Sequence, residues 1–209
     1  GYGFVETDPY SHVTTSRKGV YASGTVTEPK DIPESVTQAS AAAAEAASEI
    51  STARGTEIEV KNYPRERSVM NDFPRIGVFI CHCGINIGGV IDVPKVVESS
   101  RDLPYVELAD DETFTCSSDS LERIKEKIEE KGLNRIVVAS CTPRTHEPIF
   151  QDTLREAGLN PHLFEMVNLR DQNSWVHRGD PDKATKKAME TVKMGVTKVA
   201  DLVPIEHHK

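Results

Sequence analysis

The chain has 209 residues, of which 37% are hydrophobic and 28% charged, proportions typical of an ordinary globular protein. Its formal net charge of -8 argues against a nucleic-acid-binding protein, because such proteins carry a basic face. No apolar run approaches the ~20 residues that a membrane span needs, and the N-terminus lacks the basic and apolar regions of a signal peptide. We therefore expect a cytoplasmic protein, in which cysteines more often bind metals or do redox chemistry than form structural disulfides.

Residues 1–54 contain no cysteine and predict one strand and one helix. The apolar stretch from Gly19 to Gly24 predicts a short strand, and a turn rich in proline and charge follows it. An alanine-dense helix is expected from about Glu34 to Ile50, with Pro33 in its first turn. Residues 55–74 are charged, carry two prolines and predict a linker, although a structured loop packed on a neighbour remains open.

Residues 75–178 alternate strands with helices. Continuous apolar runs at Arg75–Cys81 and Arg135–Ser140 suit strands buried on both faces, and Ser118–Lys131 has the spacing of an amphipathic helix. The remaining predictions are a helix over 90–99, a strand over 105–108, a helix over 148–157 and a strand over 163–167. This order predicts an α/β fold with a mostly parallel sheet flanked by helices. Residues 179–209 predict a long C-terminal helix, over 181–203, and a linker.

All four cysteines of the chain lie in this α/β segment. Cys81 ends the first predicted strand, and Cys83 comes two residues later. Cys141 directly follows another strand, and Cys116 lies in the connection after the weak strand. Because parallel strands share a carboxyl edge, where open α/β folds place their ligands, we expect the four thiols to converge there.

Four thiolates suit a zinc ion or an iron–sulfur cluster. The spacing matches neither a zinc ribbon nor a ferredoxin, so two other interpretations stay open: buried apolar roles for Cys81 and Cys141, or a redox disulfide. Glycines after the first pair, at 84, 88 and 89, allow close backbone approach, and main-chain N–H groups there could bond cluster sulfides. Arg144 and His146 could offset a cluster's negative charge.

Four stretches resemble the N-terminal domain of the heterodisulfide reductase A-subunit family, which includes bacterial relatives: CHCGINIGGVIDV (81–93), TCSSDS (115–120), NRIVVASCTPRTHEPIF (134–150) and GLNPHLFEMVNLRDQNSWVH (158–177). The resemblance implies a [4Fe–4S]-binding α/β domain over 75–178. It also implies that the cluster ligands are Cys81, Cys83, Cys116 and Cys141.

The segment KGVYASGTVTEPKDIPESVTQASAAAAEA (18–46) is similar to the closing strand and helix of the same family's thioredoxin-reductase-like FAD domain. On this basis residues 1–54 are the C-terminal part of an FAD-binding domain, with Gly24, Thr25, Asp31 and Ile32 near the flavin. Many relatives carry cysteine where this chain has Thr25. The order of the two segments suggests a piece of a longer tandem-module polypeptide, and FAD is expected only in the full-length protein, because no G-x-G-x-x-G occurs here.

The resemblance therefore implies an electron-transfer segment of a flavin and iron–sulfur oxidoreductase, with catalysis at the flavin and in partner subunits. The partners it implies are other subunits or domains of such a complex, and ferredoxin is a further candidate. The alternative is a non-redox docking module, metal-free or stapled by zinc.

Overall fold

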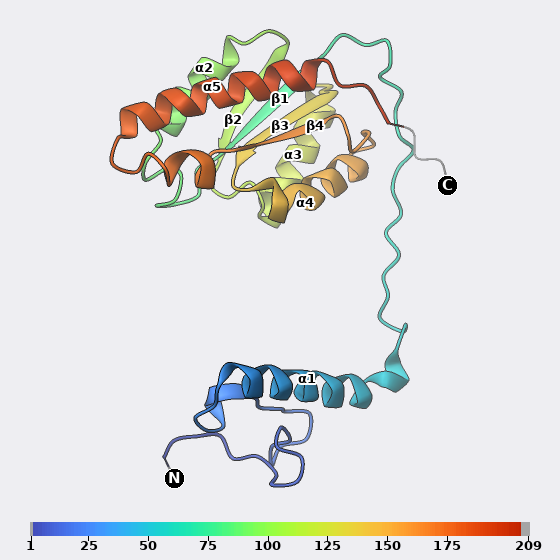
Figure 1. Ribbon diagram of the computed structural model, residues 1–209. Helices are drawn as coiled ribbons and strands as arrows, with labels where there is room; N and C mark the ends of the chain where they lie inside the picture. The colour runs from blue at the N-terminus through green and yellow to red at the C-terminus, as the bar shows by residue number, and fades with distance from the viewer. Residues whose placement is uncertain (1, 206–209) are drawn as a thin grey trace. The chain divides into compact units, whose positions relative to one another are not determined.

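The computed structural model describes residues 2–205, so residue 1 and the end of the predicted segment 179–209 lie outside it. The chain forms two compact units, residues 1–61 and residues 62–209 (Figure 1). All four cysteines belong to the second unit.

The first unit is built on one helix, α1 (Ile32–Glu49). Asp31 caps it: the Asp31 carboxylate accepts from the Glu34 amide at 2.8 Å, and the Glu34 carboxylate accepts from the Asp31 amide at 3.1 Å. This reciprocal cap starts the helix two residues before the predicted boundary. None of the α1 residues is buried, so the helix presents an unpartnered surface within this unit.

Short irregular elements complete the first unit: η1 (Gly24–Val26) and η2 (Ser51–Ala53). The predicted strand from Gly19 to Gly24 is wrong. Within it only Tyr21 pairs, in a single antiparallel bridge to Thr14. Both end glycines have positive φ, at 78° and 74°, which turns the backbone away from an extended path.

The second unit contains a four-stranded sheet in the order β2-β1-β3-β4, with every strand pair parallel. Its strands are β1 (Ile76–Cys81), β2 (Val106–Glu112), β3 (Arg135–Ser140) and β4 (Phe164–Asn168). Every residue of the two central strands β1 and β3 is buried, as their continuous apolar runs predict. The predicted α/β fold with a parallel sheet is confirmed.

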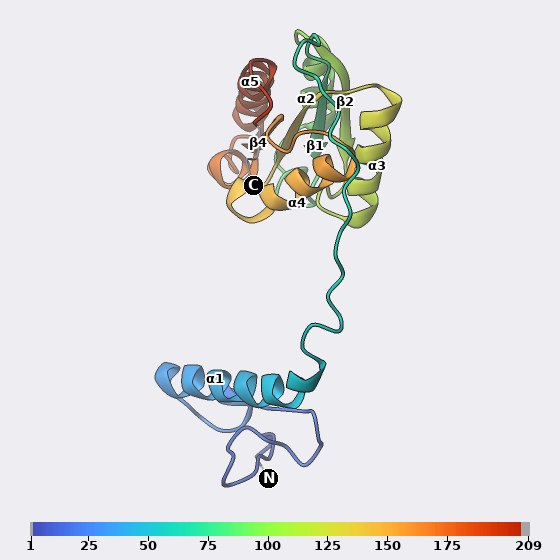
Figure 2. The same ribbon diagram turned by 90° about the vertical axis from the view of Figure 1, so that its right-hand side faces the viewer.

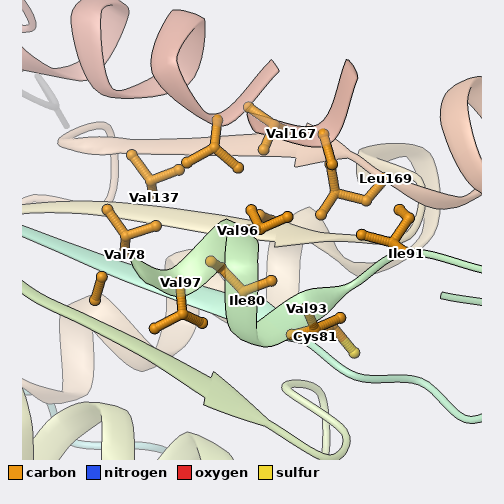
Figure 3. Close-up of a cluster of buried hydrophobic side chains, with 14 of the residues drawn as sticks. Val78, Ile80, Cys81, Ile91, Val93, Val96, Val97, Val137, Val167 and Leu169 are labelled. Carbon is orange, nitrogen blue, oxygen red and sulfur yellow. The ribbon is translucent and has the colours of Figure 1, made fainter. Parts of the chain in front are cut away.

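Helices cover both faces of the sheet (Figure 2). One face packs against α2 (Val93–Arg101) and the long α5 (Pro181–Ala200), through a buried cluster that contains Val78, Ile80 and Val137 (Figure 3). The other face packs against α3 (Ser118–Glu130) and α4 (Pro143–Glu156), whose Ile124, Ile128, Phe150 and Leu154 are buried with Phe79 and Val138. No helix in residues 2–205 combines the length and apolarity needed to cross a bilayer.

Two elements differ from their predicted bounds near the carboxyl edge of the sheet. Helix α4 begins at Pro143 rather than at 148, because Pro143 occupies its first turn and Pro148 lies inside the helix. Strand β2 runs on to Glu112, four residues beyond its predicted end, because its acidic last residues pair with β1 at the sheet edge. After β4 the chain forms a π-helical turn, η3 (Arg170–Ser174), which the sequence did not predict.

Candidate metal centre

The four cysteines lie at the carboxyl edge of the parallel sheet. Cys81 is the last residue of β1, and Cys83 starts the connection that follows. Cys141 directly follows β3 and lies two residues before α4. Cys116 lies four residues beyond the end of β2 and immediately before Ser117, the residue that caps α3. Three neighbouring strands thus deliver all four residues to one edge of the sheet.

The four residues differ in exposure. Cys81 and Cys141 are 4% and 8% exposed and join the apolar clusters on opposite faces of the sheet, whereas Cys83 is half-buried and Cys116 is exposed. Figure 3 shows Cys81 at the end of the cluster that contains Ile80 and Val93. All four thiols are free. The site therefore has two buried thiols and two that solvent can reach.

The thiols interact electrostatically across the three segments. Burial raises the pKa of Cys83, and the negative charges of Cys81 and Cys141 raise it further. Burial likewise raises the pKa of Cys116, with added repulsion from Cys81 and Cys83, and burial raises the pKa of Cys141. Each thiolate is thus costly without a cation. In residues 2–205, no three His, Cys, Asp or Glu side chains stand close enough together to hold a single metal ion.

The connection after Cys81 is a compact loop made possible by glycine. The amides of Asn86 and Ile87 both donate to the carbonyl of Cys83, at 3.0 and 3.1 Å. A Cβ on Gly88 would lie 2.7 Å from the carbonyl oxygen of His82, and one on Gly89 would lie 2.9 Å from the Cα of Ile85. Close backbone approach is thus confirmed.

The predicted role for the glycine amides is not what the loop shows. The Gly88 amide donates to the carbonyl of His82 at 3.3 Å, and the Gly89 amide donates to the carbonyl of Gly84 at 2.9 Å. Both are therefore engaged within the loop rather than turned toward the thiols. His82 itself is a spacer tied to β2, since its amide donates to the carbonyl of Glu112 at 2.8 Å and its Nδ1 lies 3.2 Å from a carboxylate oxygen of Asp111.

The two basic residues predicted after Cys141 behave differently. Nδ1 of His146 lies 3.2 Å from Sγ of Cys141, because both residues flank the first turn of α4. Arg144 is exposed, and its charge is not among those that shift the pKa of any of the three thiols described above.

Sequence reasoning missed Arg170, the cation that does act on the site. Its positive charge lowers the pKa of Cys83, Cys116 and Cys141, partly offsetting the effect of burial. The residue opens the π-helical turn η3, a conformation frequent at functional sites. A π-helical turn has no reliable sequence signal, and the position of Arg170 after β4 is the only hint that it reaches this edge.

The four residues expected near a flavin lie at the start of α1. Thr25, Asp31 and Ile32 line one shallow pocket together with Ser35. Asp31 is the helix cap, and Ile32 is 80% exposed. Gly24 is adjacent in η1 and donates its amide to the side chain of Gln38 at 2.9 Å. The structure therefore brings three of these residues to one surface and holds the fourth beside it.

The fold and the edge cysteines define the class of the second unit: an open parallel α/β domain with a thiol site at the carboxyl ends of its strands. No protein-family model matches the chain. Three curated relatives do. They are the A subunit of the H(2):CoB-CoM heterodisulfide,ferredoxin reductase of Methanothermobacter thermautotrophicus (51% identity), the second iron–sulfur A subunit of the CoB–CoM heterodisulfide reductase of Methanopyrus kandleri (50%) and the A subunit of the ferredoxin/F(420)H(2)-dependent CoB-CoM heterodisulfide reductase of Methanosarcina acetivorans (51%).

The alignments cover 65%, 64% and 59% of this chain, respectively. They cover 21%, 20% and 16% of the relatives, so the chain spans about a fifth of their length or less. The chain belongs, over this matched part, to the heterodisulfide reductase A-subunit family.

Proposed function

We propose that Cys81, Cys83, Cys116 and Cys141 bind one [4Fe–4S] cluster, and that the chain is an electron-transfer segment of an oxidoreductase of the heterodisulfide reductase A-subunit type. The observation that carries the proposal is the delivery of four free thiols to one sheet edge by three parallel strands. The relative from Methanopyrus kandleri is named an iron–sulfur subunit, which supports the same cofactor class.

The donor set fits a cluster in number and kind. A single zinc ion with four thiolates holds its sulfurs about 3.8 Å apart, as follows from a Zn–S distance of about 2.3 Å and tetrahedral geometry. A cubane takes one thiolate at each of four separate irons, so it accepts thiols that are spread more widely. Positive iron would also relieve the repulsion that raises the pKa of the thiols.

When bound, the cluster supplies one-electron transfer. The chain's own residues would fix its position and surroundings. Cys81 and Cys141 are anchored in the two apolar clusters, which keep water from that side of the site. Cys116 is exposed and marks the side from which an electron could enter or leave. His146 and Arg170 place hydrogen-bonding capacity and positive charge beside the sulfurs.

For the first unit we propose the role of the closing part of an FAD-binding domain in the full-length protein. The pocket at the start of α1 supports this, because a helix N-terminus favours anionic groups. Residues 55–74 would then connect it to the cluster domain at 75–178, with 179–209 as the closing helix and linker. The flavin itself requires the remainder of the protein, and we expect the purified chain to carry no stoichiometric flavin.

The partners we propose are other subunits or domains of a cytoplasmic flavin and iron–sulfur complex. Ferredoxin is a candidate because it appears in the names of two relatives, from Methanothermobacter thermautotrophicus and Methanosarcina acetivorans. Catalysis would reside at the flavin and in those partners.

Anaerobic purification followed by iron, sulfide and zinc analysis tests the cluster. We expect about four irons per chain and broad absorbance near ~400 nm. The double variant C81S/C141S should carry neither, whereas Ser99→Ala, which removes a hydroxyl from α2 away from the strand ends, should match the wild type. One zinc per chain, or no metal after anaerobic reconstitution with iron and sulfide, would overturn the proposal in favour of a docking module.

A further inference from the structure

The turn after β4 is fastened to the cysteine-bearing segments on both sides. The amide of Leu169 donates to the carbonyl of Ser140 at 2.7 Å, which ties the entry of the turn to the residue before Cys141. At its exit, the hydroxyl of Ser174 donates to the carbonyl of Asn86, and Nε1 of Trp175 lies 3.2 Å from the Asn86 side-chain oxygen. The turn therefore spans from the Cys141 segment to the Cys83 loop.

Within this turn Arg170 is held from two directions. Its Nε donates to the carboxylate of Asp171 at 3.0 Å, and its guanidinium carbon lies 4.9 Å from the centre of the Trp175 ring. Asp171 is itself fixed, since its carboxylate accepts from the Asn168 side chain at 2.7 Å. The Arg170 side chain is 24% exposed, so its position is defined by these contacts rather than by solvent.

Asn168 sets the path of the backbone that carries this arginine. Its side-chain oxygen accepts from the amides of Arg170 and Asp171, at 3.1 and 3.0 Å, and the residue is 7% exposed. The amides of Ser174 and Trp175 then reach back five residues, to the carbonyls of Leu169 and Arg170, at 3.0 Å each. This wide turn replaces a helix that would carry Arg170 away along the sheet face.

Arg170 influences thiols from all three cysteine segments, whereas Arg178, at the end of the same connection, is exposed and is not among the groups that shift their pKa. The two arginines thus differ in their effect on the site while sharing one segment of chain. A fixed positive charge near a redox group favours the form with the extra electron, because reduction adds one negative charge.

We propose that Arg170 is a positioning residue for electron transfer: held by Asp171, Trp175 and the η3 turn, it supplies the fixed positive charge that raises the reduction potential of the cysteine site. This inference rests on the proposed [4Fe–4S] cluster at Cys81, Cys83, Cys116 and Cys141. One electron from an external reductant reduces the site, and the charge of Arg170 offsets the added negative charge without itself changing protonation.

The test compares anaerobically loaded wild type, R170Q, R170K and R178Q. Each is titrated with dithionite while electron paramagnetic resonance reports the reduced fraction, and iron content is measured in parallel. We expect R170Q to disfavour the reduced state by about tenfold, a shift of about 59 mV to more negative potential for a one-electron couple. R170K should recover most of this shift, and R178Q should match the wild type.

Four outcomes decide the inference. A potential of R170Q equal to that of R178Q, at wild-type iron content, would overturn it, as would equal shifts in R170K and R170Q. If R170Q takes up no iron while R170K does, the requirement for charge is supported, and if neither does, a structural role replaces it. A wild-type chain that binds no cluster rejects the proposed function, and this inference with it, and is recognised because all four proteins are then colourless.

Discussion

Nδ1 of His146 lies 3.2 Å from Sγ of Cys141, across the first turn of α4. The contact exists because that helix begins at Pro143, directly after the strand that delivers the cysteine. An imidazole N–H at this distance can donate a hydrogen bond to a thiolate sulfur, and such bonds stabilise charged sulfur ligands. A bound cluster should therefore depend on His146 although His146 is not one of the proposed ligands.

We expect His146→Ala to load with iron but to lose it about tenfold faster to an anaerobic chelator, which corresponds to about 1.4 kcal/mol for one hydrogen bond to a charged group. The decay of absorbance near ~400 nm measures the rate. His177→Ala is the control, because His177 lies at the end of the η3 connection, where its amide donates to the carbonyl of Asn173 at 2.9 Å. Equal rates in the two variants would show that the His146 contact has no role in holding the cluster.

The loop between Cys83 and α2 provides a second test, since its geometry excludes a side chain at Gly88. A Cβ there would lie 2.1 Å from Cδ2 and 2.7 Å from the carbonyl oxygen of His82, and the backbone atom cannot move without displacing its neighbours, the two cysteines. Gly88→Ala should destabilise the unit by about 1–3 kcal/mol, the usual cost of overpacking. Iron uptake should fall to less than half that of the wild type.

Gly179→Ala is the matched control for this change, because nothing lies within 4 Å of a Cβ at Gly179. Urea unfolding followed by circular dichroism gives the stability, and iron analysis gives the loading. A Gly88→Ala protein with unaltered stability and full iron content would show that the loop adapts without cost.

The sequence predicts the centre of this fold better than its edges. Strands β1 and β3 are fully buried, so their apolar runs leave no alternative to a two-sided strand, and their predicted bounds are correct to within one residue. Strand β2 ends in Ala109-Asp110-Asp111-Glu112, residues of low strand propensity that pair only because β1 lies beside them. Its true length depends on tertiary contacts and could not be predicted from local pattern.

The site divides in the same way. Once the sheet is parallel, the convergence of the cysteines on one edge follows from topology alone. The position of Arg170 does not, because it depends on the Asn168 side chain and on hydrogen bonds that reach back five residues. Proximity in sequence to Cys141 favours Arg144 instead, yet that residue is exposed.

Cys116 allows the stabilising effect of the proposed cluster to be separated from packing. Its side chain is exposed, so Cys116→Ser should leave the melting temperature of the metal-free chain unchanged within about 1 °C. In the iron-loaded state the wild type should melt at least about 5 °C higher than the metal-free form, because ligand binding to the folded state stabilises it and ties three connections together.

Calorimetry of loaded and metal-free samples of both proteins measures this difference. Cys116→Ser should lose most of the gain on loading, together with the colour. A variant that melts with the loaded wild type would mean that the fourth thiol adds nothing to the connection between segments. A metal-free variant that melts far below the metal-free wild type would instead assign Cys116 a packing role.

Asp171 should make the stability of the second unit depend on pH in the acid range. Burial raises the pKa of its carboxyl, but hydrogen bonds from Asn168 and Arg170, with the charge of Arg170, outweigh burial and leave the pKa below its usual value of 3.8. A carboxyl whose pKa is lower in the folded than in the unfolded chain stabilises the fold fully above the unfolded value. The contribution is lost as the pH falls through the folded value.

The expected result is that Asp171→Asn lowers the free energy of unfolding by about 1 kcal/mol at pH 7, where the carboxylate accepts both bonds. The gap between wild type and variant should stay constant down to about pH 5 and should narrow below about pH 4, as the wild-type carboxyl becomes protonated. Urea unfolding of the reduced, metal-free chain between pH 3 and 7 measures it, with Asp201→Asn, an exposed residue that caps the end of α5, as control. A gap between wild type and Asp171→Asn that is independent of pH would show that the charge of Asp171 does not hold the turn that carries Arg170.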